Sequence, residues 1–76
     1  MDRVELRKQI GDQIRDLRGS HAVTQVELVK KYNQFPPEDL TITVKNLSKY
    51  ETGKTAMPAD KYVKLRLCFT HMSNQY

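Results

Sequence analysis

Apolar side chains recur every three or four residues along four stretches of the chain, a spacing typical of helices that bury one face. It predicts helices over residues 2–18, 24–32 and 43–52, and a fourth helix that begins near Pro58. No stretch alternates apolar and polar residues as a strand would, so the expected fold class is all-α, with one four-helix domain over residues 1–76. The apolar positions that carry the pattern are Leu6, Ile10, Ile14, Leu17, Leu28, Val29, Tyr32, Val44, Leu47, Tyr50, Tyr62, Leu65, Phe69 and Met72.

Residue types at the ends of these stretches support the helix boundaries. Thr24 and Glu27 have the spacing of a capping box, and Thr43 is a second candidate N-cap. Pro58 suits the first turn of a helix because that turn leaves its amide hydrogens unpaired, and proline has none. The residues expected to end the first three helices are Gly19-Ser20, Asn33 and Gly53.

Two features depart from a plain helical pattern. Gly11 lies inside the first predicted helix, where glycine costs about 1 kcal/mol relative to alanine, so we expect another backbone to approach closely there. The segment 34–41 contains Pro36-Pro37, which excludes a helix through its start. We expect at least two apolar residues of this region to pack against the second and third helices: Phe35, Leu40 and Ile42.

The charge of the chain is distributed unevenly. The formal net charge is +4, and residues 1–42 carry equal numbers of acidic and basic side chains, so the whole excess lies in residues 43–76. This asymmetry favours a polyanionic partner that contacts the second half. The apolar runs are too short for a membrane span or a secretory signal, and the lone Cys68 is expected to be a small buried residue. These features indicate a cytoplasmic protein with no membrane partner.

A catalytic or metal-binding function has little support in the sequence. His21 and His71 are far apart and have no cysteine or carboxylate cluster at metal-ligand spacing, so each is expected to be a solvated surface histidine. The chain has no glycine-rich phosphate loop and no visible nucleophile–base arrangement. We therefore expect no enzyme activity, no cofactor, no metal and no small-molecule substrate.

Three segments, taken in order, resemble the helix-turn-helix family of Cro- and CI-type phage repressors. They are IGDQIRDLR at residues 10–18, TQVELV at residues 24–29 and LSKYETGK at residues 47–54, and Pro58 followed by Leu65 is similar to the start of the fourth helix in that family. The resemblance implies a lambda-repressor-like helix-turn-helix domain. The chain departs from the family in its inserted segment between the second and third helices, in a valine where the second helix usually has alanine, and in a missing or reduced fifth helix.

The resemblance also implies sequence-specific binding of double-stranded operator DNA by a phage or prophage-type repressor, with residues 43–52 in the major groove. Lysine can donate to guanine and asparagine can pair with adenine. The residues expected to read bases are Val44, Lys45, Asn46, Ser48 and Lys49, and those expected to contact phosphates are Gln25, Thr43, Thr52, Lys54 and Thr55. Lys61, Lys64 and Arg66 are expected to add diffuse positive charge. Arg18 and Glu51 match an ion pair that orients the recognition helix, so both are assigned a structural role.

The expected assembly is a homodimer on DNA that is weak or absent in solution, in the cytoplasm and associated with the nucleoid. The acidic Glu38-Asp39 pair should turn the tip of the inserted segment away from the DNA backbone, because phosphates repel it. An alternative stays open, in which residues 34–42 form the docking surface of a protein-binding adaptor or antirepressor-type module. An exposed Phe35 would favour that alternative.

Overall fold

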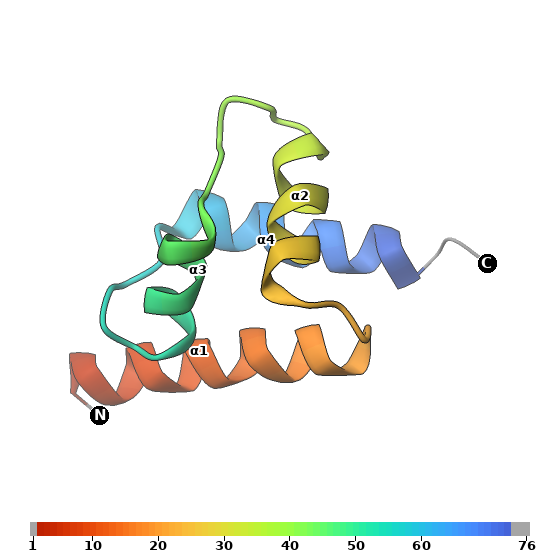
Figure 1. Cartoon of the computed structure of the whole chain (residues 1–76). Helices are drawn as coiled ribbons and strands as arrows, with labels where there is room; N and C mark the ends of the chain where they lie inside the picture. Colours follow the sequence, from red (N-terminus) through yellow and green to blue (C-terminus); the bar gives the residue numbers. More distant parts are fainter. Residues whose placement is uncertain (1, 74–76) are drawn as a thin grey trace.

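The computed structural model describes residues 2–73, and over that range it contains four helices and no strand. The helices are α1 (Arg3–Ser20), α2 (Gln25–Gln34), α3 (Val44–Glu51) and α4 (Ala59–Ser73). Figure 1 shows α1 along the base, α2 and α3 standing above it, and α4 crossing behind those two helices. The expected all-α, four-helix fold is therefore confirmed. No helix within residues 2–73 combines the length and the apolar character needed to cross a membrane.

Side-chain caps begin α2 and α3. Thr24 and Glu27 form the predicted capping box, in which the Thr24 hydroxyl accepts from the Glu27 amide and the Glu27 carboxylate accepts from the Thr24 amide, both at 3.1 Å. Thr43 caps α3 in the same way, with Asn46 in the place of the acidic residue. Both boxes pair amide groups that a helix start would otherwise leave without partners.

The ends of α1 and α3 each use one residue in the left-handed conformation. Gly53 follows α3 with φ of 76°, and the Lys54 amide donates to the Lys49 carbonyl at 3.0 Å, as the sequence predicted for a glycine at this position. α1 ends at Ser20, within the predicted Gly19-Ser20 stop, but both residues are helical, and the left-handed residue is Ala22 with φ of 54°. Gly19 has open space around it and stays helical at small cost.

The end of α2 also differs from the prediction, since the helix continues to Gln34 and Asn33 does not terminate it. Asn33 stays helical, and its side-chain amide donates to the Ile42 carbonyl and accepts from the Ile42 amide, both at 2.9 Å. A partner distant in sequence thus outweighs the local tendency of asparagine to end a helix. The start of α4 is shifted by one residue, because Pro58 precedes the first helical residue, Ala59.

The core lies where the four helices meet. Its buried apolar side chains are Ile14, Leu28, Val29, Tyr32, Ile42, Leu47, Tyr50, Leu65, Cys68 and Phe69. Gly11 confirms the expected close approach, because a Cβ atom at this position would overlap the backbone carbonyl oxygens of Tyr50 and Glu51. The backbones of α1 and α3 are therefore in direct contact, and any larger residue at position 11 would push them apart.

Residues 35–43 join α2 to α3, and we call this segment the 35–43 connection. Lys64 joins it to α4, because the Lys64 ammonium donates to the carbonyls of Pro37 at 2.6 Å and Leu40 at 2.7 Å. Ile42 is buried in the core as predicted, and Phe35 packs on the His71 ring of α4, with centroids 5.5 Å apart. The connection is thus fixed at both α2 and α4.

Candidate nucleic-acid interface

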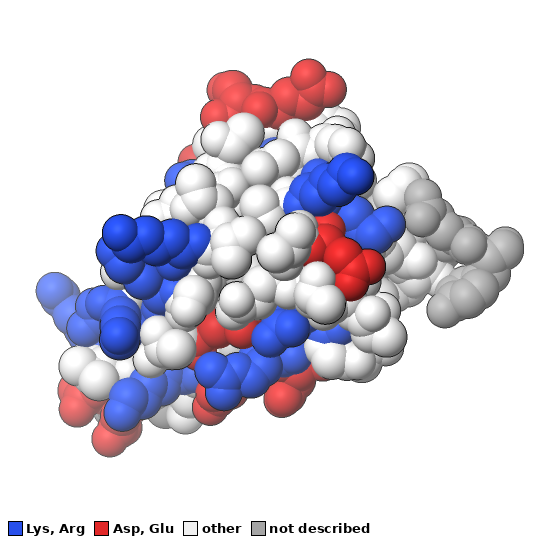
Figure 2. All heavy atoms as spheres, viewed as in Figure 1, with Lys and Arg blue, Asp and Glu red and all other residues white. Residues whose placement is uncertain are grey.

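The outward face of α3 is polar and basic. Lys45 and Lys49 are exposed on it, Ser48 is half-buried between them, and Val44 is 36% exposed at the start of the helix. Figure 2 shows Lys and Arg atoms in separate groups on the face in view, with Asp and Glu atoms among them along the base of the molecule and at the tip of the 35–43 connection. The exposed Lys45 and Lys49 give the outward face of α3 a local positive charge that is suited to a polyanion.

Asn46 is less available than the sequence suggested. Its Oδ1 accepts from the Thr43 hydroxyl at 2.9 Å and from the Thr43 amide at 3.4 Å, so it belongs to the cap of α3. Pairing with adenine needs both the oxygen and the nitrogen of the amide. Asn46 could present only its nitrogen without breaking the cap. Thr43 and Thr52 likewise use their hydroxyl groups as donors within α3, the latter to the Ser48 carbonyl at 3.0 Å.

The inner face of α3 is held by Glu51, whose side chain is 1% exposed. Arg18 of α1 donates to both carboxylate oxygens, at 2.9 Å through Nε and 3.1 Å through Nη2. Gln25 of α2 donates to the same carboxylate at 3.2 Å, so one side chain joins three helices. The ion pair expected between Arg18 and Glu51 is present, and its geometry fixes the angle of α3 to α1 and α2.

Gln25 therefore has a structural contact in addition to the phosphate contact predicted for it. One hydrogen of its side-chain amide donates to the Glu51 carboxylate, and the second can still donate to another acceptor. The N-terminal amides of α2 favour an anion nearby. The Thr24 amide, however, already donates to the Glu27 carboxylate. Hydrogen bonds from the backbone and the hydroxyl of Thr24 lower the pKa of Glu27, so this carboxylate stays charged at the helix start.

Lys54 and Thr55 are exposed directly after α3, where the sequence placed phosphate contacts. The structure adds Arg15 of α1, which the sequence reasoning missed. Its side chain is 53% exposed, and its Nε lies 3.8 Å from a Glu51 oxygen, beside the junction of α1, α2 and α3. The available signal was its spacing of three residues from Arg18, which places both guanidinium groups on one face of α1.

Lys64 was expected to contribute diffuse positive charge, and this expectation is wrong. The residue is 2% exposed, and its ammonium lies 4.2 Å from the centroid of the Tyr32 ring. Burial lowers the pKa of Lys64, and the nearby Asp39 carboxylate partly opposes this effect. Lys64 is buried because it lies four residues before Cys68, on the inner face of α4. Of the three cations on α4, Lys61 is half-buried and Arg66 is exposed.

His21 and Cys68 both have contacts in the packed part of the fold. His21 is not solvated as expected, because its ring nitrogens are hydrogen-bonded to the Leu17 carbonyl at 2.8 Å and to the Ser73 hydroxyl at 2.7 Å, and its ring packs on Phe69. Cys68 is buried as predicted, and burial raises the pKa of its thiol. Residues 2–73 contain no group of three or more side chains that could hold a metal ion.

Comparison with known proteins does not place the chain in a family. No protein-family model matches it, and neither a curated protein nor a solved structure does so. Its function therefore has to be argued from the geometry of the described residues.

Proposed function

We propose that the chain is a sequence-specific binder of double-stranded DNA that reads the major groove with α3. One observation carries this proposal: α3 presents Lys45, Ser48 and Lys49 outward while its opposite side is fixed by the buried Glu51. A reading helix must be exposed on one face and rigid on the other, because a mobile helix could not hold donors in register with base edges.

The residues of this surface divide into two roles. Lys45 and Lys49 are free to donate to guanine oxygen and nitrogen atoms, and Val44 can contact a thymine methyl group. Lys54, Thr55 and the second amide hydrogen of Gln25 are placed to contact phosphates beside α3, and Arg15 joins them from α1. Asn46, Thr43 and Thr52 support the helix through its caps, which is a revision of the roles that the sequence suggested.

Selection of bound sequences from random double-stranded DNA tests the proposal directly. We expect a preferred sequence and an affinity that falls steeply with salt, with a slope of roughly −4.5 in log K against log salt if about five phosphates are neutralised. If the selection yields no preferred sequence and the affinity does not depend on salt, the proposed function is wrong.

Matched variants separate base reading from phosphate binding. Lys45→Ala and Lys49→Ala should each cost about 1–3 kcal/mol on the selected site and little on random DNA. Lys30→Ala is the control, because Lys30 is an exposed lysine of α2 to which neither role is assigned. Asn46→Ala should instead lower the free energy of unfolding by about 1 kcal/mol through the lost cap. Equal losses on both DNAs would assign the two lysines to phosphates.

The alternative of a protein-binding adaptor relied on an exposed Phe35. Phe35 is half-buried, and its ring packs against His71 of α4. The exposed residues of the 35–43 connection are chiefly Pro36, Pro37, Glu38 and Asp39, and no apolar anchor is exposed among them except the two prolines. No specific feature of this segment therefore favours the adaptor over DNA binding.

A further inference from the structure

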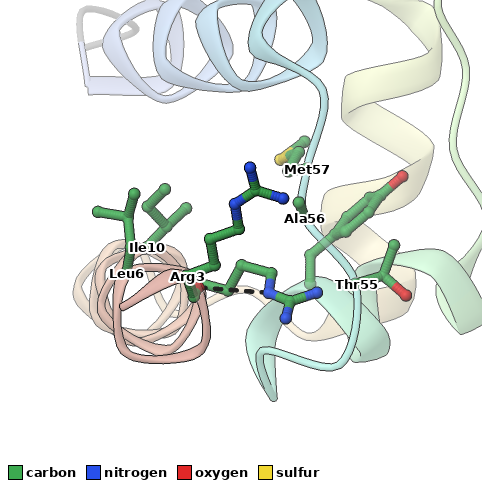
Figure 3. Close-up of a pocket in the computed structure, with 8 residues that line it drawn as sticks. Arg3, Leu6, Ile10, Thr55, Ala56 and Met57 are labelled. Carbon is green, nitrogen blue, oxygen red and sulfur yellow. Dashed lines mark hydrogen bonds between the residues drawn. The ribbon is translucent and has the colours of Figure 1, made fainter. Parts of the chain in front are cut away.

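A hollow of about 340 Å³ lies between the N-terminal half of α1 and the segment that follows α3. Figure 3 shows Leu6 and Ile10 on one side of it and Thr55, Ala56 and Met57 on the other. Tyr50 of α3 also lines it. Leu6 is 50% exposed, so part of this apolar lining faces water. Cavities that bind small molecules have this size range and this mostly apolar lining.

Two arginines of α1 line the same hollow. In Figure 3 the Arg3 side chain reaches between the two walls toward Met57, and the Arg7 Nε donates to the Arg3 carbonyl at 3.3 Å. The ion pairs found within residues 2–73 join Arg15 and Arg18 to Glu51, and neither Arg3 nor Arg7 takes part in one. Two guanidinium groups without a carboxylate partner therefore border an apolar cavity.

We propose that this hollow binds a small apolar monocarboxylate. The alkyl or aryl part lies on Leu6, Ile10 and Met57, and the carboxylate pairs with Arg3 and Arg7. The planar guanidinium matches a carboxylate with two parallel hydrogen bonds, and the ligand also covers apolar surface that now faces water. An inorganic anion would use only the arginines, and a neutral apolar molecule would use only the lining. Binding at this site does not depend on the proposed DNA function.

The test uses hexanoate, titrated into the chain with labelled methyl groups on leucine, isoleucine and methionine. We expect saturable NMR shifts at Leu6, Ile10 and Met57, with a Kd on the order of millimolar for a ligand of this size. Hexan-1-ol, hexylammonium and acetate serve as controls that each lack one part of the ligand. Each should bind about tenfold more weakly or worse. Hexan-1-ol and hexylammonium lose the charged hydrogen bonds to the arginines, and acetate loses the apolar contact with the lining.

The double variant Arg3→Gln/Arg7→Gln should weaken hexanoate binding about tenfold, while Arg66→Gln, an exposed arginine on α4, should leave it unchanged. Unchanged core methyl signals at Ile14 show that both variants fold. Absence of saturable shifts, equal affinity for hexan-1-ol, or an equal loss in Arg66→Gln would each overturn the proposal. If the same methyl groups shift on raising the protein concentration alone, the occupant is a second copy of the chain, and the assignment to a small carboxylate is wrong.

Discussion

Glu51 is a buried carboxylate, and a charge in that position is tolerated only when its hydrogen-bonding capacity is used. Arg18 fills two acceptor sites and Gln25 a third, while Arg15 lies further off at 3.8 Å. These contacts come from two different helices, so they orient α3 as well as stabilise it. Removing one hydrogen-bond partner of Glu51 should therefore lower the stability of the fold and weaken the proposed DNA binding.

Arg18→Met tests this contact. The change leaves the Glu51 carboxylate buried without its bidentate partner, so we expect the free energy of unfolding to fall by roughly 3 kcal/mol, at the lower end for buried pairs because Arg18 is 22% exposed. Adding Glu51→Gln should recover at least about 1 kcal/mol, because the stranded charge is gone. Urea unfolding of both single variants and the double variant measures the coupling. Additive single effects would mean that the pair contributes little.

A second residue-scale prediction concerns Tyr32, a fully buried side chain whose hydroxyl has no hydrogen-bond partner within residues 2–73. Burial raises the pKa of Tyr32 from 10.0 to about 12. Between these values the unfolded chain loses the phenolic proton and the folded chain keeps it, so stability falls as pH rises through this window. The loss is at most about 1.4 kcal/mol per pH unit.

Tyr32→Phe removes both the unpaired hydroxyl and this titration. We expect the variant to be more stable than the parent by up to about 1 kcal/mol at pH 7, and the difference to grow between pH 10 and pH 12. The measurement is urea unfolding of both proteins across this pH range. Parallel pH profiles would contradict the raised pKa.

At the scale of elements, the 35–43 connection determines how α3 begins. Asn33 of α2 holds the Ile42 backbone at one end, and Lys64 of α4 holds two carbonyls near the tip. Thr43, the cap of α3, follows Ile42 directly in the chain. The position of α3 therefore depends on contacts that reach both α2 and α4, although neither contact touches α3 itself.

Lys64→Met tests whether these contacts act as proposed. The carbonyls of Pro37 and Leu40 lose their donor, and relief of the lysine's burial offsets part of this loss, so we expect a net cost of only about 1 kcal/mol. The larger effect should be local, as faster hydrogen exchange at the Ile42 amide and weaker DNA binding. Lys30→Met, at an exposed position of α2, is the control. Unchanged exchange at Ile42 would show that Asn33 alone holds the connection.

The sequence predicted those elements that depend on neighbours along the chain. The Thr24–Glu27 capping box, the left-handed Gly53 and the four helical stretches all follow from local spacing, and the structure contains each of them. Gly11 was also recognised, because a glycine inside a helix has a cost that calls for a tertiary reason. The Arg18–Glu51 pair was expected from the family resemblance and not from spacing.

Contacts between distant segments were the part that the sequence did not predict. Asn33 and Asn46 are residues whose side chains can bond to several kinds of partner, and their choice depends on which backbone lies nearby in the fold. From its residue type alone, Lys64 is expected at the surface, and only its place on the inner face of α4 shows that it is buried. The hollow beside Arg3 depends on the path of the chain after α3, for which no residue pattern gives a signal.

At the scale of the whole molecule, the helix that we propose to read DNA is short. The eight residues of α3 span about 12 Å at 1.5 Å per residue, which covers only a short run of base pairs. A specific site therefore needs a second copy. A stable dimer interface buries about 800 Å² on each partner, a large fraction of a total surface of 5098 Å². The exposed apolar pair on α4, Val63 and Leu67, is only two side chains, whereas a stable interface takes about 20–30 residues a side.

We therefore predict that the chain is monomeric at micromolar concentration and that two copies assemble on DNA. The selected sequence should contain two inverted half-sites about 10 base pairs apart, centre to centre, because two reading helices related by a two-fold axis must face the same side of the duplex. Sedimentation velocity should show one copy without DNA, two copies on the full site, and one copy when the second half-site is scrambled. The two shorter extents of the molecule, 26 Å and 19 Å, are below the roughly 34 Å of one DNA turn, so two copies can lie side by side on one face. A stable dimer without DNA would contradict the argument from interface area, and one copy on the full site would contradict the argument from helix length.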